Sequence, residues 1–237
     1  VLGDVQYEFG NILFGGPCNQ DCVFCIGKQL SPSLSPRNHR VWPLKNIDSF
    51  IDAMLRSQTK RIILTGTTTD PQLYKHEAAL LQFLREQIPA AHISLHTNGL
   101  LGLKKLDLFN SYDTVTLSLN SMDPQTFRRI HGVITMPDLA RLMERATVPV
   151  KLSCVLTAEN QNEVESYLEK ASALGVKRVA LRNEFHVGQP SKTIPVPLFA
   201  DMTPTRYHCD SPVYDLHGME VTHWIFDKTG GQSLNLF

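Results

Sequence analysis

The sequence has neither an excess of one charge nor a long hydrophobic run. Its 23 Lys and Arg balance 23 Asp and Glu, so the formal net charge is +0 with neutral histidines. No apolar stretch reaches the roughly 18 residues that a membrane-spanning helix needs. Residues 1–10 also lack the basic and apolar regions of a secretory leader. These absences disfavour a membrane anchor and a basic nucleic-acid-binding surface. We therefore expect a cytoplasmic protein with no membrane partner, and nucleic acid is disfavoured as a partner.

Cysteine is scarce, and its distribution is uneven. The chain has five cysteines, an odd number that argues against a disulfide framework. Three of them, Cys18, Cys22 and Cys25, fall within eight residues, whereas Cys154 and Cys209 stand alone. So tight a group, in a chain long enough to bury a sizeable core, is more typical of a metal site in a reducing compartment than of bridges. The sequence thus predicts that the chemistry starts near the N-terminus.

Apolar, β-rich segments alternate with segments of helical period along most of the chain. The six predicted strands are residues 7–14, 61–65, 92–97, 114–119, 150–156 and 176–181. The predicted helices are residues 47–56, 73–87, 103–109, 124–130, 136–146 and 162–174. Such alternation predicts parallel strands joined by right-handed connections. Because six units are fewer than the eight of a closed barrel, we predict an α/β fold, a partial (β/α)6 TIM-like barrel.

The alternation stops after Arg182. Residues 189–212 contain five prolines, which exclude a long regular element and predict a loop. Residues 213–237 have β-type patches around Gly218 and around Gly230 and Gly231, from which we predict one or two hairpins. We assign residues 1–187 to the barrel core. Residues 188–237 form a predicted C-terminal extension of the same domain, which closes the barrel mouth and shapes the substrate pocket.

The cysteine loop directly follows the first predicted strand, at the end where parallel α/β folds place their sites. Its pattern is Cys-x3-Cys-x2-Cys, with Phe24 just before Cys25. A four-iron cluster usually takes four cysteines, so three leave one iron open to an exogenous ligand. The alternative is a zinc ion held by the same thiolates and a fourth ligand such as His39. Zinc motifs, however, usually combine two ligand pairs that lie far apart in the sequence.

This motif, in this position, resembles the radical S-adenosylmethionine (SAM) superfamily. In that family SAM binds the open iron of a 4Fe-4S cluster through its amino and carboxylate groups. One electron then cleaves SAM to methionine and a 5′-deoxyadenosyl radical. The resemblance implies that Cys18, Cys22 and Cys25 hold the cluster. It also implies SAM as the second cofactor and an electron donor such as flavodoxin or ferredoxin as a partner.

Further segments extend the resemblance over about residues 7–185. After the second strand the family has Gly-Gly-Glu-Pro, where this chain has Thr-Gly-Thr-Thr-Thr-Asp-Pro at residues 65–71. A capped turn before the next helix is the alternative interpretation of that segment. The Thr-Asn-Gly at 97–99 is similar to a family motif, and residues 118–130 resemble the corresponding stretch of the GTP cyclases of molybdenum-cofactor synthesis. The cofactor-binding residues implied by the resemblance are Phe24, Thr67, Thr68, Thr69, Asp70, Asn98, Ser118, Asn120, Ser153 and Arg182.

Two of these expectations also have a physical basis in the residues themselves. Ser118 and Asn120 alternate with apolar residues, so both are expected to point to the barrel interior. An Arg near the end of the sixth strand suits the SAM carboxylate, because a guanidinium offers paired donors, although an Arg in a surface ion pair is the alternative.

The C-terminal part of the chain is where we expect the substrate-binding residues. Cys154 and Cys209 cannot by themselves hold a second cluster, so we expect a single one. Cys209 and Tyr214 are the candidate catalytic residues, as radical or hydrogen donors. The leading hypothesis is an enzyme that abstracts hydrogen from a small-molecule substrate, such as a nucleotide or a sugar derivative, for rearrangement, cyclisation or carbon–carbon bond formation. The alternatives are modification of RNA or a peptide by the same chemistry, and a zinc-stabilised, non-catalytic α/β binding module.

Overall fold

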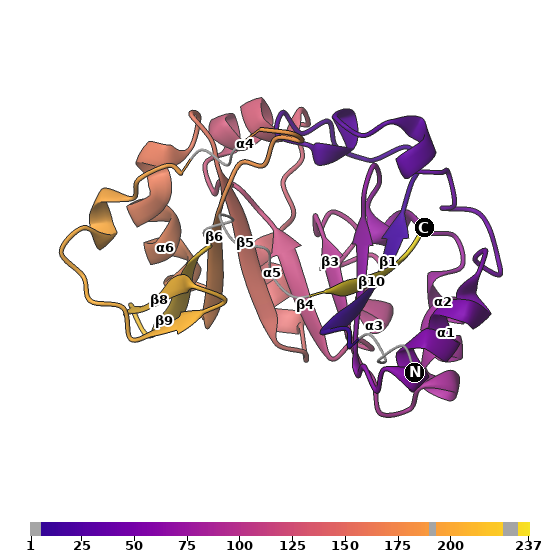
Figure 1. Cartoon of the computed structure of the whole chain (residues 1–237). Helices are drawn as coiled ribbons and strands as arrows, with labels where there is room; N and C mark the ends of the chain where they lie inside the picture. Colours follow the sequence, from indigo (N-terminus) through magenta and orange to yellow (C-terminus); the bar gives the residue numbers. More distant parts are fainter. Residues whose placement is uncertain (1–5, 190–192, 225–231) are drawn as a thin grey trace.

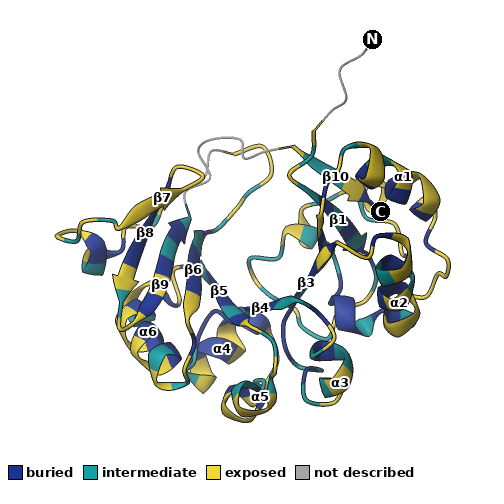
Figure 2. Cartoon of the chain, turned by 90° about the horizontal axis from the view of Figure 1, so that it is seen from below, coloured by how far each residue is buried: buried dark blue, intermediate teal, exposed yellow. Residues whose placement is uncertain are grey.

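A computed structural model describes residues 6–189, 193–224 and 232–237 of the chain. These residues form one sheet of ten strands in the order β10-β1-β2-β3-β4-β5-β6-β9-β8-β7. The sheet curves into an open barrel, and the helices cover its outer, convex side (Figure 1, Figure 2). The predicted α/β partial barrel is therefore confirmed.

The first six strands pair in parallel with their sequence neighbours, as strand–helix alternation predicts. These strands are β1 (Phe9–Phe14), β2 (Arg61–Gly66), β3 (His92–Thr97), β4 (Thr114–Ser118), β5 (Val150–Leu156) and β6 (Arg178–Asn183). The connecting helices are α1 (Ile47–Arg56), α2 (Glu77–Gln87), α3 (Leu106–Phe109), α4 (Pro124–His131), α5 (Leu139–Arg145) and α6 (Val164–Ala173).

The hydrophobic core lies between the sheet and the helices. In α1 the buried residues Ile47, Phe50, Ile51 and Met54 repeat at helical spacing and form one apolar stripe. A Cβ added at Gly10 of β1 would lie 2.6 Å from atoms of both Phe50 and Met54. The absence of a side chain at this position therefore lets α1 pack directly on β1. The other face of each strand is left to line the barrel interior.

Several predicted helices begin later than the sequence pattern indicates. The segment predicted as one helix over residues 73–87 instead starts with a short 3-10 turn, Pro71–Leu73, and α2 begins at Glu77. The Asp70 side chain accepts a hydrogen bond from the Gln72 amide and caps this turn. Side-chain caps also fix the starts of α4, at Asp123, and of α5, at Asp138.

The C-terminal extension lengthens the sheet. Strand β9 (Met219–Trp224) pairs in parallel with β6, and β8 (Ser211–Leu216) and β7 (Arg206–His208) follow as antiparallel neighbours. The hairpin predicted around Gly218 is the β8–β9 turn, where Gly218 has φ +71°. The prediction that residues 189–212 form only a loop is wrong, because β7 lies within them.

The last strand joins the opposite edge of the sheet. Strand β10 (Ser233–Leu236) pairs in parallel with β1, so it is not part of a hairpin. The Asn11 amide donates to the Asn235 side-chain oxygen at 2.9 Å across this pair. The predicted turn at Gly230 and Gly231 lies outside the described residues. The domain division at residues 187 and 188 stays a prediction.

No helix in the described part of the chain is long and apolar enough to cross a membrane.

Candidate active site

A cavity of about 530 Å³ lies where the carboxyl ends of the strands meet the cysteine loop. This is the end of a parallel barrel at which α/β enzymes bind their ligands. The walls come from the cysteine loop, from the ends of β2 to β6 and from the end of α4. The lining residues are Cys18, Gln20, Cys22, Phe24, Cys25, Ile26, Thr65, Gly66, Thr67, Thr69, Asp70, His96, Thr97, Asn98, Thr116, Ser118, His131, Ser153, Val155, Arg182, Asn183 and Phe185.

The cysteine loop rests on the C-terminal turn of α4. The Asp21 amide donates to the His131 carbonyl and the Val23 amide donates to the Ile130 carbonyl, each at 2.9 Å. The last carbonyls of a helix lack partners within the helix, so these bonds satisfy both the helix end and the loop. The loop is thus fixed by a helix more than a hundred residues away in the sequence.

On its other side the loop is held by the polar segment after β2 and by the end of β3. The Gly16 amide donates to the Thr68 hydroxyl at 2.9 Å. The Thr69 hydroxyl donates to the Pro17 carbonyl at 2.5 Å. The side-chain Nδ2 of Asn98 donates to the side-chain oxygen of Asn19, the neighbour of Cys18, at 2.7 Å. The segment that replaces the family's Gly-Gly-Glu motif therefore supports the cysteine loop directly.

The three cysteines share one wall of the cavity. Burial, together with the neighbouring Cys25 and Cys18, raises the pKa of the Cys22 thiol to about 12. In the described residues, no three His, Cys, Asp or Glu side chains gather around one metal-ion position. Cysteines that each bind a different iron of a cluster need no such convergence, whereas a zinc site does. His39 does not line the cavity, so the geometry fits the cluster better than the zinc alternative.

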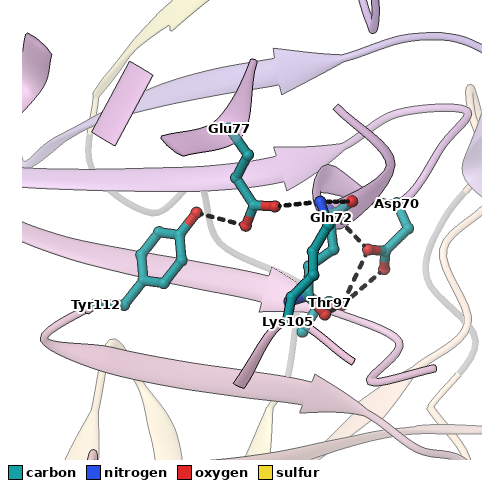
Figure 3. A network of polar contacts seen from close by, with 6 residues as sticks. All are labelled: Asp70, Gln72, Glu77, Thr97, Lys105 and Tyr112. Atoms are coloured by element: carbon teal, nitrogen blue, oxygen red, sulfur yellow. Dashed lines mark hydrogen bonds and ion pairs between the residues drawn. The ribbon is translucent and has the colours of Figure 1, made fainter. Parts of the chain in front are cut away.

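Asp70 ties the loop after β2 to the end of β3 (Figure 3). Its side chain is 5% exposed and accepts hydrogen bonds from the Gln72 amide at 2.9 Å and the Asn98 amide at 2.7 Å. The Thr97 hydroxyl donates to the same carboxylate at 2.9 Å. Burial raises the pKa of Asp70, although the Asn98 and Gln72 amides oppose this shift. Asp70 thus fixes Asn98, which in turn holds the cysteine loop.

A second buried carboxylate supports this arrangement from behind (Figure 3). Glu77 pairs with Lys105 at 2.8 Å and accepts a hydrogen bond from the Tyr112 hydroxyl at 2.9 Å. Lys105 also donates to the Gln72 carbonyl. Burial raises the pKa of Glu77, and the hydrogen bond from Lys105 opposes this shift. Glu77 does not line the cavity, which gives this pair a structural role.

Most of the cofactor-binding residues predicted from the sequence line the cavity, and two do not. Thr68 bonds the loop at Gly16 instead. Asn120 was expected inward by alternation with Ser118, but β4 ends at Ser118, so the alternation stops there. Asn120 is 1% exposed, and its carbonyl accepts a hydrogen bond from Asn160 at 2.7 Å. Those that line the cavity are Phe24, Thr67, Thr69, Asp70, Asn98, Ser118, Ser153 and Arg182.

The two candidate catalytic residues lie away from the cavity. Tyr214 of β8 stacks on Phe199, with 4.3 Å between ring centroids, under the short 3-10 turn Pro197–Phe199. Its strand partner is the buried Val221. Cys209 lies exposed in the β7–β8 turn with φ +47°. Neither side chain lines the cavity, and their role as hydrogen donors stays a prediction.

The barrel interior carries a group of basic side chains that sequence reasoning missed apart from Arg182. Burial, together with Arg182, Arg178 and Arg61, lowers the pKa of Lys151 on β5 to about 8. Burial lowers the pKa of His96 to about 3, with Arg182 and Lys151 as the next causes. Among the described residues, no carboxylate forms an ion pair with Lys151 or Arg182. Lys151 and Arg182 could have been found from the sequence, because each is a basic residue at an inward-facing position of a strand.

Arg182 is placed to meet a ligand. Its Nε is buried without a hydrogen-bond partner among the described residues, and the guanidinium lies 5.7 Å from the ring centroid of Trp224 on β9. A buried guanidinium nitrogen without a partner among the described residues favours an anionic group in the cavity.

The comparisons with known proteins match this geometry. The family model for the radical SAM superfamily matches residues 12–178, which is more than half of the chain. The chain belongs to the radical SAM superfamily. Radical SAM enzymes use a 4Fe-4S cluster and SAM, so the two cofactors predicted from the sequence are confirmed at the level of the family. The chain is 30% identical over 191 residues to a probable GTP 3′,8-cyclase of Sulfurisphaera tokodaii, covering 74% of this chain and 56% of that protein.

Further radical SAM proteins share the fold. The GTP 3′,8-cyclase of Haemophilus influenzae is 25% identical over 170 residues, covering 69% of this chain and 49% of that protein. The chain thus spans about half the length of the curated relatives it matches. The crystal structure of SuiB from Streptococcus suis bound to SAM has a TM-score of 0.60 at 17% identity, covering 78% of this chain and 42% of that one. Native anSMEcpe with bound SAM has a TM-score of 0.53 at 17% identity, covering 74% of this chain and 52% of that one.

Proposed function

We propose that this chain uses a single 4Fe-4S cluster to cleave SAM reductively. The resulting 5′-deoxyadenosyl radical abstracts hydrogen from a small molecule, such as a nucleotide or a sugar derivative. The proposal is carried by one observation: Cys18, Cys22 and Cys25 line a cavity whose other walls are the ends of five parallel strands. When bound, the cluster and SAM supply the radical. The protein has to hold both, orient the substrate and exclude water.

The residues that would hold each group lie on separate walls. The three cysteines would hold the cluster. The loop that contains Thr67 and Asp70 lies beside the cysteines and would take the amino end of SAM. We assign Ser118 and Ser153, which are paired across β4 and β5, to the polar groups of SAM above the strand ends. A reduced flavodoxin or ferredoxin is the proposed electron donor.

The cationic interior supports an anionic substrate. Lys151 and Arg182 lie on neighbouring strands of the interior face, and Arg182 lines the cavity. Placing cations together in a buried space costs free energy that a bound phosphate or carboxylate recovers. A nucleotide or a phosphorylated sugar would supply such an anion, in addition to the SAM carboxylate expected at Arg182.

The experiment that tests the proposed function is an anaerobic reconstitution with iron and sulfide. The protein is then reduced with dithionite in the presence of SAM, and 5′-deoxyadenosine is measured by chromatography. We expect a brown protein that forms 5′-deoxyadenosine only when both dithionite and SAM are present. A colourless protein that binds zinc tightly and forms none would exclude the radical function. A loaded cluster that does not cleave SAM would indicate that a substrate or another reductant is needed.

The proposed anion site predicts a pH dependence of nucleotide binding. Because only the protonated Lys151 attracts a phosphate, and burial lowers its pKa to about 8, affinity should fall between pH 7 and pH 9. We expect Lys151→Met to weaken GTP binding at pH 7 by roughly tenfold, or about 1.4 kcal/mol. The variant should also remove most of the fall in affinity with pH.

Isothermal titration calorimetry with GTP, at constant ionic strength, checks this prediction. Lys170→Met on the outer helix α6 is the matched control and should bind as the unchanged protein does. Equal affinity and equal pH dependence in Lys151→Met would show that the interior lysine takes no part in anion binding.

A further inference from the structure

His131 is a rigidly held, fully buried side chain beside the cysteine loop. It is the last residue of α4 and is 0% exposed. Its ring stacks on Phe127, with 4.2 Å between centroids, and meets Phe24 edge-on at 6.0 Å. These contacts fix the plane of the imidazole, so its nitrogen atoms have defined neighbours.

The proton on this ring can be assigned from its neighbours. Nδ1 lies 3.1 Å from Oε1 of Gln20 and 3.3 Å from Sγ of Cys22. An amide oxygen only accepts hydrogen bonds, so Nδ1 must carry a proton to bond it. The Cys22 sulfur lies within hydrogen-bond distance of the same nitrogen and of the same Gln20 oxygen, so the amide oxygen and the sulfur share one N–H group. Cys22 is in turn one of the three proposed cluster ligands.

We propose that His131 donates its Nδ1–H to the Cys22 sulfur when that sulfur binds the cluster, and that this bond raises the reduction potential of the cluster. The inference rests on the proposed function, because it requires the cluster. An added electron increases the negative charge on the sulfur ligands, so a fixed N–H donor stabilises the reduced state more than the oxidised state. His131 is thus a positioning residue that acts through Cys22.

The arrangement is specific to one of the three cysteines. In the part of the chain that the structure describes, no hydrogen bond joins a side-chain nitrogen to the Cys18 or Cys25 sulfur, and Cys18 contacts only the Asn19 side-chain oxygen at 3.7 Å. The main chain of His131 has a separate role, since its carbonyl accepts the hydrogen bond from Asp21 that holds the loop. Side-chain substitutions leave this carbonyl in place, so they test the imidazole and not the docking of the loop.

The test compares two variants of similar shape, His131→Asn and His131→Leu. Both lose the ring, but the Asn side chain can place an N–H close to the position of Nδ1, whereas Leu cannot. The reduction potential of the reconstituted cluster without SAM is measured by electron paramagnetic resonance during a redox titration. We expect the ratio of reduced to oxidised cluster in His131→Leu to fall about tenfold at a fixed potential, a downward shift of about 59 mV for one electron.

His131→Asn should stay nearer to the unchanged protein than His131→Leu does. Phe127→Leu, which removes the stacked ring but keeps the imidazole, serves as the control and should shift less than His131→Leu. An unchanged potential in His131→Leu would overturn the inference, and so would equal shifts in the Leu and Asn variants.

A measurement on the unchanged protein keeps the inference testable if the variants do not fold. The chain is labelled with nitrogen-15 only in histidine, and pulsed electron paramagnetic resonance is recorded on the reduced cluster. We expect a weak coupling to one histidine nitrogen. A loaded, SAM-cleaving cluster without this coupling would refute the role of His131 and leave the proposed function intact. Failure of the unchanged protein to bind a cluster would instead refute the proposed function itself.

Discussion

Replacing Cys22 by alanine is expected to abolish the formation of 5′-deoxyadenosine. The cavity wall then offers only the sulfurs of Cys18 and Cys25, and two thiolates cannot complete the three-cysteine set that leaves a single iron open for SAM. The loop itself should persist, because its backbone bonds to α4 do not involve the Cys22 side chain. We therefore expect a folded protein with little bound iron and with product at the level of a protein-free control.

Iron content, visible absorbance and chromatography of 5′-deoxyadenosine, compared at equal protein concentration, check this prediction. Cys209→Ser is the matched control, since Cys209 lies exposed in a turn away from the cavity. This control should keep both iron and product. Full product formation by Cys22→Ala would show that the cysteine loop does not carry the chemistry.

The second large effect is expected from Asp70→Asn. The Asp70 carboxylate faces three donors: the amides of Gln72 and Asn98 and the hydroxyl of Thr97. A carboxamide has only one accepting oxygen and turns its NH2 group toward at least one of these donors. A buried donor left without an acceptor costs roughly 1–3 kcal/mol, and a bond to a charged acceptor contributes more. Burial of the charge, which raises the pKa of Asp70, offsets part of this gain, so we expect the free energy of unfolding to fall by roughly 1–3 kcal/mol.

Losing the Asp70 hydrogen bonds should also weaken the support of the cysteine loop, because the Asn98 side chain holds Asn19 beside Cys18. We therefore expect a higher KM for SAM in Asp70→Asn. Urea denaturation with an unchanged m-value measures the stability, and initial rates of 5′-deoxyadenosine formation measure the KM. Asp52→Asn, an exposed position of α1, is the control and should lie within about 0.5 kcal/mol of the unchanged protein. Equal stability of the two variants would mean that the Asp70 bonds contribute nothing net.

The sequence allowed the barrel to be predicted where its signals are local. Alternating apolar strands and amphipathic helices set the six β/α units, and the three cysteines predicted the centre of the site. The strand β10 could not be placed in the same way. Residues 233–236 indicate a strand, but nothing in them indicates which edge of the sheet it joins. The partner of an edge strand is set by the tertiary structure as a whole.

The site residues that the sequence did not reveal were missed for the same reason, because the tertiary structure sets their neighbours. His131 lies 109 residues from Cys22 in the sequence, and an apolar helix face with a histidine is typical of a packed core. Lys151 on β5 has a local signal, because it alternates with buried Val150 and Leu152, but only the curvature of the sheet brings it near Arg182. Tyr214 was expected at the pocket because the sequence does not show which face of a hairpin points inward.

The pairing of β10 with β1 has a consequence for the order in which the protein is made. Ribosomes add roughly 5–20 residues per second, so β1 emerges some ten to forty seconds before the strand that covers its outer edge. During that time the edge of the strand that leads into the cysteine loop can pair with another nascent chain. Translation that stops before Ser233 leaves this edge open permanently. Truncated chains should therefore aggregate even though every residue of the cysteine loop is present.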